Sequence, residues 1–274
     1  MTIPVHDADD PRLDYYRGLR DRRLADACGR FIAEGKRLTE RLIASDLTVE
    51  SILVDDRRAA EIEAIAPADV PVYQASREVM AKLAGFAIHT GVLSVGLRRR
   101  NPTIDELVAG ATGPITLMVA PMLKEPANVG AMVRTCAAFG VTGLIIGPRC
   151  CDPFYRRAVR VSMGTVFRVP IRRSEDLATD IRALQQQHQV QCIATTLNDA
   201  ELLHDARRPA NDRLALLLGH EVDGLEPDVE ALCDRRVTLP MHLGTDSLNV
   251  SVAAAVFCYH FMPPAQPIRL PEAE

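Results

Sequence analysis

The chain has 274 residues, of which 47% are hydrophobic and 25% charged, and its formal net charge is −4. This length suits two ordinary domains, and the composition is that of a folded globular protein. No apolar run reaches the roughly 18 residues that a membrane span needs, and the polar, acidic segment 1–10 is typical of neither a signal peptide nor a transit peptide. A cytoplasmic protein without a membrane partner is expected.

The seven cysteines form no Cys-x-x-Cys pair and no Cys/His cluster at metal-ligand spacing. An odd number of scattered cysteines is typical of a reducing compartment, where thiols pack as small hydrophobic groups. We therefore expect neither a disulfide nor a metal. The net negative charge excludes a wholly basic nucleic-acid binder, but a local basic surface would suffice for RNA.

The first part of the chain alternates short apolar runs with helical patterns after a flexible tail, which is expected over residues 1–15. The predicted strands are 30–34, 51–55, 70–73 and 91–97, and the predicted helices are 36–44, 57–65 and 77–83. This order predicts a small α/β sandwich domain over residues 16–97. Residues 98–113 open with a charge run and Asn-Pro, which is typical of a linker with one or two helical turns.

A second α/β series occupies residues 114–265, and residues 266–274 are expected to be another tail. The predicted strands are 115–120, 143–146, 191–195, 214–218 and 237–239, and the predicted helices are 128–139, 176–189, 227–233 and 247–261. These strands are continuous apolar runs, which is typical of a parallel sheet covered on both faces.

Three polar segments follow strands of this sheet, where ligands of α/β proteins bind. They are Asn128–Arg134 at a helix start, Leu218–Gly224 with a polar pair between glycines, and Leu239–Ser251, in which Ser247 occupies a helix N-cap position. Taken alone, the first is more typical of a helix cap and a solvated arginine. No G-x-G-x-x-G and no G-x-x-x-x-G-K-[ST] motif is present, which argues against nicotinamide dehydrogenases and nucleoside triphosphatases.

Together these segments resemble the three signature motifs of the SpoU/TrmH methyltransferases of the SPOUT superfamily, over roughly residues 114–262. Arg30–Gly35 and Gly91–Gly96 are similar to the ribosomal-protein-like substrate-binding domain that many members carry. The resemblance implies a parallel-sheet α/β domain with a C-terminal trefoil knot and a homodimer. It also implies methyl transfer from S-adenosylmethionine to a ribose 2′-hydroxyl in structured RNA, either ribosomal or transfer RNA, of which we favour ribosomal RNA.

By position in the motifs, the resemblance implies catalytic roles for Asn128, Arg134, Glu221, Ser247 and Asn249. It implies that the cofactor is held, largely through backbone, at Thr195, Gly219, Leu239, Met241 and Leu248. His220 departs from the family pattern, which has a small residue there. His220 either alters the pocket rim or points to solvent, and we expect the second.

The 2′-hydroxyl is a poor nucleophile until its proton leaves, so the reaction needs a base. The resemblance nominates Arg134, yet a guanidinium, with a pKa above about 12, is normally never deprotonated. Arg134 is therefore either a strongly desolvated base near the sulfonium cation or a clamp on the adjacent phosphate, and the sequence leaves both open.

Candidate RNA phosphate contacts are Arg98, Arg99, Arg100, Arg156, Arg157 and Arg160. A solvated charged surface is the ordinary alternative for such runs. The N-terminal domain would present RNA to the site of the partner subunit. A catalytically silent RNA-binding or ribosome-associated protein is the alternative function; the presence of all five motif residues argues against it.

Overall fold

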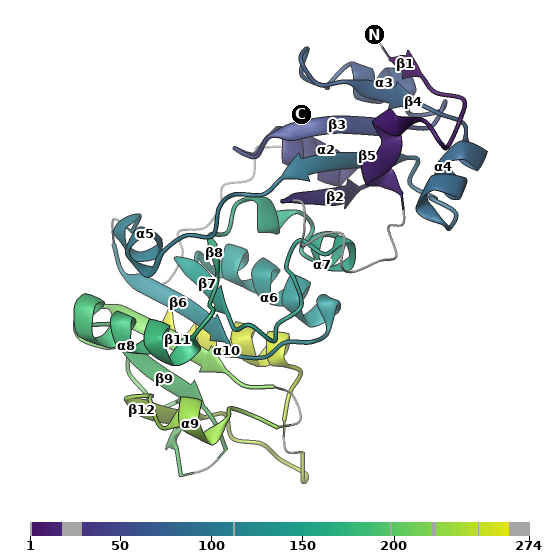
Figure 1. The fold of residues 1–274 in the computed structure, drawn as a ribbon. Helices are drawn as coiled ribbons and strands as arrows, with labels where there is room; N and C mark the ends of the chain where they lie inside the picture. The colour runs from purple at the N-terminus through teal and green to yellow at the C-terminus, as the bar shows by residue number, and fades with distance from the viewer. Residues whose placement is uncertain are drawn as a thin grey trace, which may run out of the picture. The chain divides into compact units, whose positions relative to one another are not determined.

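The computed structural model describes residues 2–17, 29–111, 113–197, 199–220, 223–245 and 247–262. These residues form two compact units (Figure 1). The first comprises Met1–Pro102, Leu123–Arg134 and Arg149–Pro170, and the second comprises Thr103–Met122, Thr135–Pro148 and Ile171–Glu274. No helix in the described ranges is both long and apolar enough to cross a membrane.

The first unit contains a five-stranded mixed sheet in the order β1-β4-β3-β5-β2. The strands are β1 (Ile3–Pro4), β2 (Arg30–Glu34), β3 (Val49–Val54), β4 (Val72–Gln74) and β5 (Val92–Leu97), and the helices packed with them are the 3-10 helix η1 (Pro11–Tyr16), α2 (Lys36–Ile43), α3 (Ala59–Glu63) and α4 (Arg77–Ala84). Strand β5 runs antiparallel to β2 and β3, whereas β4 runs parallel to β1 and β3. The prediction of a small α/β domain is confirmed.

The expected tail over residues 1–15 is instead part of this unit. Strand β1 pairs with β4, and Leu13 and Tyr16 are completely buried. The Tyr16 hydroxyl lies 2.7 Å from the Ser51 hydroxyl. Val5 and Ala8 are buried in the same core, but these few apolar side chains are irregularly spaced in a polar segment and so produce no periodic pattern in the sequence.

Two short helices that the sequence pattern did not reveal, α7 (Arg156–Val161) and the 3-10 helix η2 (Thr165–Phe167), also pack in the first unit. The centroid of the Phe31 ring on β2 lies 4.9 Å from the ring centroid of Phe154 and 5.4 Å from that of Phe167. A side chain at Gly130 would approach the Ala158 carbonyl oxygen to 2.5 Å, so the glycine permits the helix that carries it to pack closely on α7.

The second unit is a seven-stranded parallel sheet in the order β10-β12-β9-β11-β6-β7-β8. Its strands are β6 (Ile115–Ala120), β7 (Gly143–Ile146), β8 (Ile171–Arg173), β9 (Gln191–Thr195), β10 (Glu201–Leu202), β11 (Arg213–Leu218) and β12 (Arg235–Thr238), and its helices are α5 (Ile104–Ala109), α8 (Leu177–His188), α9 (Pro227–Glu230) and α10 (Val250–Phe261). Helix α6 (Pro126–Phe139) links β6 to β7. The predicted parallel sheet is confirmed, with β8 and β10 as additions.

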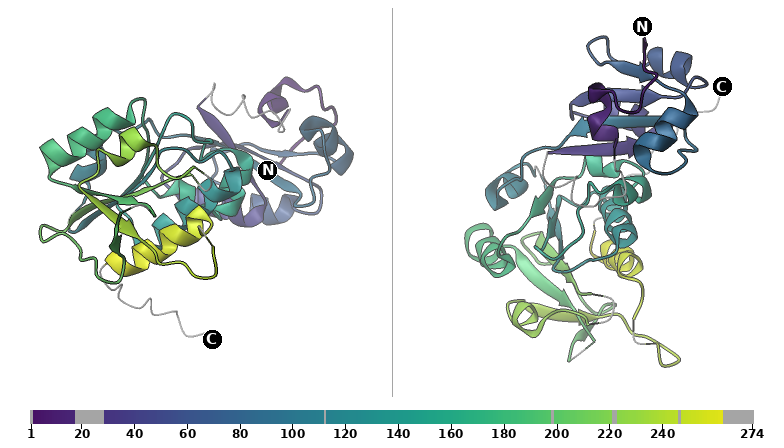
Figure 2. Two further views of the ribbon diagram at one scale, coloured as in Figure 1. Left: turned by 90° about the horizontal axis from the view of Figure 1, so that it is seen from below. Right: turned by 45° about the vertical axis from the view of Figure 1, so that its right-hand side comes forward.

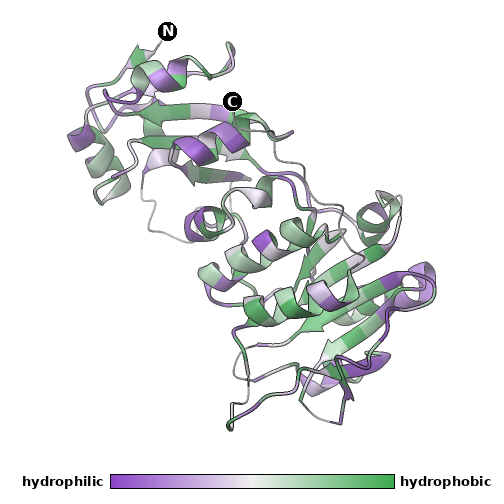
Figure 3. Ribbon diagram, turned by 180° about the vertical axis from the view of Figure 1, so that it is seen from behind, coloured by the Kyte–Doolittle hydropathy of each residue, from purple (hydrophilic) through white to green (hydrophobic). Residues whose placement is uncertain are grey.

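Helices α8 and α10 cover opposite faces of the seven-stranded sheet (Figure 2). The face below α5 and α8 is a continuous apolar core that includes Leu117, Ile145 and Leu217. The central strands of the seven-stranded sheet and most of α10 are hydrophobic (Figure 3), and a hydrophobic central strand is expected where a sheet is covered on both faces. This arrangement fixes the strand ends, and therefore the loops that follow them.

Candidate functional site

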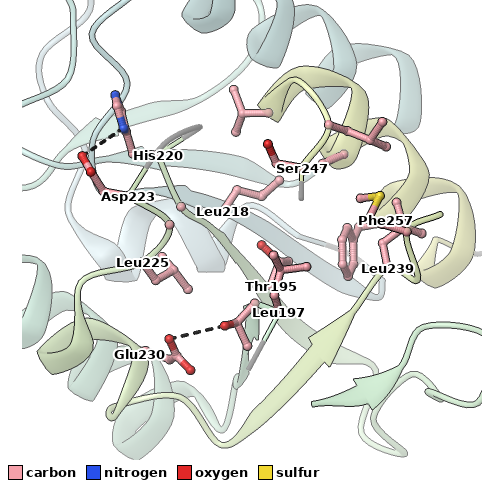
Figure 4. A pocket seen from close by; sticks show the side chains of 17 residues that line it. Thr195, Leu197, Leu218, His220, Asp223, Leu225, Glu230, Leu239, Ser247 and Phe257 are labelled. Atoms are coloured by element: carbon pink, nitrogen blue, oxygen red, sulfur yellow. Dashed lines mark hydrogen bonds and ion pairs between the residues drawn. The ribbon is translucent and has the colours of Figure 1, made fainter. Parts of the chain in front are cut away.

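A cavity of about 520 Å³ lies beyond the carboxyl ends of the central strands in the second unit (Figure 4). Leu218 at the end of β11 pairs with Thr195 at the end of β9, which in turn pairs with Val237 on β12. The three strands therefore end side by side, and the loops that follow them enclose the cavity. Its lining comes from residues 195–197, 218–220, 223–225, 230, 239, 241, 247, 248, 250, 253 and 257.

The loop after β11 has glycine at two positions that disfavour any other residue, for two different reasons. His220 and Gly224 exchange two backbone hydrogen bonds of 2.8 and 2.9 Å. A Cβ at Gly219 would stand 2.2 Å from the Gly224 carbonyl carbon, and Gly224 itself has φ +67°. A side chain at Gly219 would clash with the backbone, and a side chain at Gly224 would be strained by the left-handed φ, so glycine leaves the backbone open to a ligand at the cavity wall.

The loop after β12 carries the third motif into α10. Asn249 caps this helix, because its Oδ1 accepts hydrogen bonds from the Ser251 backbone N–H at 3.0 Å and the Ser251 hydroxyl at 2.6 Å. The prediction that Ser247 is the N-cap is therefore wrong, since α10 begins only at Val250. Ser247 instead lines the cavity.

The structure brings most of the predicted cofactor and motif residues together. The cavity lining contains Thr195, Gly219, Leu239, Met241, Ser247 and Leu248. Their functional roles stay predictions. Glu221 lies outside the described residues.

His220 lies in the cavity wall rather than pointing to solvent, so our expectation for it is wrong. Its side chain is 15% exposed, and its Nδ1 lies 3.3 Å from an Asp223 carboxylate oxygen. The paired backbone hydrogen bonds to Gly224 hold the residue in the turn, and the Asp223 carboxylate lies beside the ring (Figure 4).

Several lining residues were not predicted. Phe257 and Ala253 come from the buried side of α10, and Thr196 and Glu230 add polar groups to the wall. The Thr195 hydroxyl, by contrast, donates to the Leu217 carbonyl at 2.9 Å, so it braces two strands. The position of Glu230 depends on how α9 packs, and no motif marks it.

Asn128 and Arg134 lie on α6, which begins at Pro126 rather than at Asn128. Proline suits the first turn of a helix because its missing N–H would have no helical partner. Asn128 is therefore inside the first turn, with its N–H bonded to the Glu125 carbonyl at 3.0 Å. Arg134 is exposed on the same helix.

The predicted RNA-binding arginines fall into two groups within the first unit. Arg98 pairs with Asp152 at 2.5 Å, Arg99 donates to the Phe167 carbonyl at 2.7 Å, and Arg156 pairs with a glutamate of β2. Arg157 and Arg160 on α7 are exposed and have no ion-pair partner within the described ranges. The second group is the better placed for phosphate, and Arg100, also exposed, stays a candidate.

Two family models match the chain. The SpoU rRNA methylase family matches residues 116–259, and the MRM3-like substrate-binding domain matches residues 10–93. The first range contains all three motifs and every residue of the cavity lining.

Proteins similar to this chain are also named as RNA methyltransferases. The chain is 38% identical to an uncharacterized tRNA/rRNA methyltransferase of Mycobacterium bovis, over 93% of this chain and 90% of that protein. It is 30% identical to a 23S rRNA (guanosine-2′-O-)-methyltransferase of Acinetobacter baylyi, over 75% of this chain and 84% of that protein. The AdoMet-bound rRNA methyltransferase from Sinorhizobium meliloti shares the fold, with a TM-score of 0.80, 22% identity and coverage of 94% and 97% of the two chains. The chain therefore belongs to the SpoU rRNA methylase family.

Proposed function

We propose that this protein transfers a methyl group from S-adenosylmethionine to a ribose 2′-hydroxyl of ribosomal RNA in the cytoplasm. The observation that carries the proposal is the cavity in the second unit, which gathers residues of the second and third motifs at the ends of β11 and β12. Relatives named as 23S rRNA (guanosine-2′-O-)-methyltransferases support ribosomal RNA as the substrate.

The cavity suits S-adenosylmethionine in size and chemistry. About 520 Å³ is within the usual range for small-molecule sites. Leu218, Leu239 and Phe257 supply apolar wall for an adenine ring, while the backbone around Gly219 supplies hydrogen-bonding groups. The cofactor contributes an activated methyl group on a sulfonium. We further propose that the strands and loops around it form the trefoil knot typical of the superfamily.

The chain must position the ribose and accept its proton. Ser247 lines the cavity, and Asn249 is held at the start of α10. Arg134, exposed in the single chain, has two candidate roles: a base for the 2′-hydroxyl once bound RNA and cofactor desolvate it, or a clamp on the neighbouring phosphate. Both need the guanidinium, so removing it tests its participation, and lysine in its place separates the two.

We propose that residues 16–97 and the exposed arginines Arg157 and Arg160 bind the RNA backbone. The match of residues 10–93 to a substrate-binding domain supports this assignment. Arginine suits the task because its planar fork matches phosphate oxygens.

We also propose a homodimer that buries α10. Val252 and Tyr259 are 49% and 81% exposed, and seven residues apart they lie on one side of the helix. An exposed apolar stripe on a helix that is otherwise hydrophobic favours contact with a second copy.

The proposal is tested by methyl transfer to RNA. Ribosomal and transfer RNA from cells lacking the gene should be incubated with the purified protein and labelled S-adenosylmethionine, with RNA from wild-type cells as control. Label is expected in ribosomal RNA of the deletion strain alone, as a 2′-O-methyl group mapped to one nucleotide. Label in transfer RNA alone, or on a base, would overturn the assignment.

A further inference from the structure

The wall of the cavity carries a largely buried carboxylate that belongs to none of the three motifs. The Glu230 side chain is only 15% exposed and lines the cavity. One of its oxygens accepts a hydrogen bond of 2.8 Å from Nε of Arg236, and the other lies 3.5 Å from the Thr196 hydroxyl (Figure 4). Residues from α9, β12 and the end of β9 thus converge on one carboxylate.

These contacts fix the carboxylate without using all of its hydrogen-bonding capacity. A carboxylate offers about four acceptor positions, and the two contacts occupy one on each oxygen. Burying a charge is costly unless a partner compensates it, and Arg236, 45% exposed, supplies that partner without lining the cavity. The arrangement presents a rigid, charge-compensated pair of acceptors to whatever fills the cavity.

Glu230 lies away from the part of the cavity that contains the motif residue Ser247. Ser247 and His220 lie on one side of the cavity, and Glu230 lies on the other, beyond Leu225 (Figure 4). If the reactive atom of a ligand lies near Ser247, a different part of that ligand therefore contacts Glu230.

We propose that Glu230 binds the ribose of S-adenosylmethionine, accepting hydrogen bonds from its 2′- and 3′-hydroxyls; this deepens the proposed function and rests on it. Two vicinal hydroxyls present two donors side by side, which match the two oxygens of one carboxylate. In dinucleotide-binding α/β folds an acidic side chain hydrogen-bonds a ribose 2′-hydroxyl, so a carboxylate in this role has a precedent. The Arg236 ion pair already neutralises Glu230, so a neutral diol fits better than the ammonium group of the methionine part.

The test is calorimetric binding of S-adenosylhomocysteine and three analogues, the 2′-deoxy, 3′-deoxy and desamino forms, to the full chain. Each deoxy analogue is expected to bind the wild type at least about tenfold more weakly, as for the loss of a hydrogen bond to a charged group. Glu230→Gln should bind S-adenosylhomocysteine about tenfold more weakly and lose much of this discrimination. Glu230→Asp keeps the charge but retracts it by one methylene. Its affinity for S-adenosylhomocysteine should lie between those of the wild type and Glu230→Gln.

The controls separate this role from a structural one. Asp228→Asn changes an exposed carboxylate of the same helix that does not line the cavity, and should bind all four ligands as the wild type does. Wild-type-like affinities in Glu230→Gln would overturn the proposal, as would loss of discrimination against the desamino analogue in place of the deoxy ones. Absence of binding to the wild type would instead refute the proposed cofactor, and the ribose assignment with it.

Discussion

The guanidinium of Arg156 on α7 donates a hydrogen bond of 2.6 Å to the carboxylate of Glu34 on β2, across 122 positions of the chain. The Glu34 side chain is 8% exposed and that of Arg156 is 24% exposed. The same guanidinium lies over the Phe86 ring, 4.3 Å from its centroid. Arg156 is thus held on two sides within the first unit, and its charge compensates a buried carboxylate.

Replacement of Arg156 by alanine should therefore destabilise the protein. Removing the partner leaves Glu34 buried and uncompensated, which costs at least about 1–3 kcal/mol because the unpaired group is charged. Arg157→Ala, at the exposed neighbouring position, is the matched control and should leave stability unchanged within about 0.5 kcal/mol. Urea unfolding measures both. Equal midpoints for the two variants would contradict a structural role for Arg156.

In contrast to Arg156, the exposed pair Arg157 and Arg160 should contribute to RNA binding and not to stability. Each phosphate contact releases a counterion. Loss of one contact therefore reduces the slope of the logarithm of the binding constant against the logarithm of the salt concentration by roughly one. The double alanine variant is expected to bind RNA more weakly, with a slope smaller by about two, at unchanged stability. Filter binding at several salt concentrations measures this. An unaltered slope would exclude both arginines from the RNA contact.

Patterns in the sequence predicted buried elements well. The bounds of β2, β6, β7 and β9 agree with the prediction, since each is a run whose apolar side chains meet a core. Short elements such as β8 and β10, at three and two residues, fall below the length at which periodicity is informative. Their existence depends on pairing with distant strands.

The site shows the same division between local and tertiary information. The glycine-bracketed loop at Gly219 is predictable because its backbone demands are local. Ser247 and Asn249 are both good N-cap residues, and the sequence alone does not decide between them. The placement of Glu230 and His220 in the cavity wall depends on how α9 and the turn pack, which no local pattern encodes.

The exposed stripe on α10 predicts how the oligomer can be disrupted. The wild type should sediment near twice its chain mass of 30.1 kDa. Changing both Val252 and Tyr259 to glutamate should yield a monomer, because charges would have to be buried at the contact. Both side chains are exposed in the single chain, so the fold should survive, and circular dichroism checks this. A wild type that sediments as a monomer at micromolar concentration would refute the dimer.

Buried thiols predict a loss of stability at alkaline pH. Burial raises the pKa of Cys258 and of Cys233 to about 12, compared with about 8.5 for an unfolded thiol. The folded protein therefore binds protons that the unfolded chain releases, so this contribution is complete below about pH 8.5 and is lost as the pH rises toward 12. The urea midpoint should fall above pH 9, and less steeply in Cys258→Ala. Identical pH dependence in that variant and the wild type would exclude Cys258 as a cause.

Arg134 offers the most direct test of the chemistry. It is the only basic residue in α6, and it is exposed on a helix whose other side chains are mostly apolar. If it serves as base or as phosphate clamp, Arg134→Ala should lower methyl transfer at least about a hundredfold, the lower range for one acid–base or electrostatic group. Cofactor affinity should change little, because the predicted cofactor residues lie on the later loops. Arg134→Lys keeps a point charge but loses the planar fork. If Arg134 is a clamp, methyl transfer by Arg134→Lys should therefore be reduced at every pH. If it is the base, the lysine, with its lower pKa, should restore methyl transfer as the pH rises. Near-normal transfer by a folded Arg134→Ala variant would remove Arg134 from the mechanism.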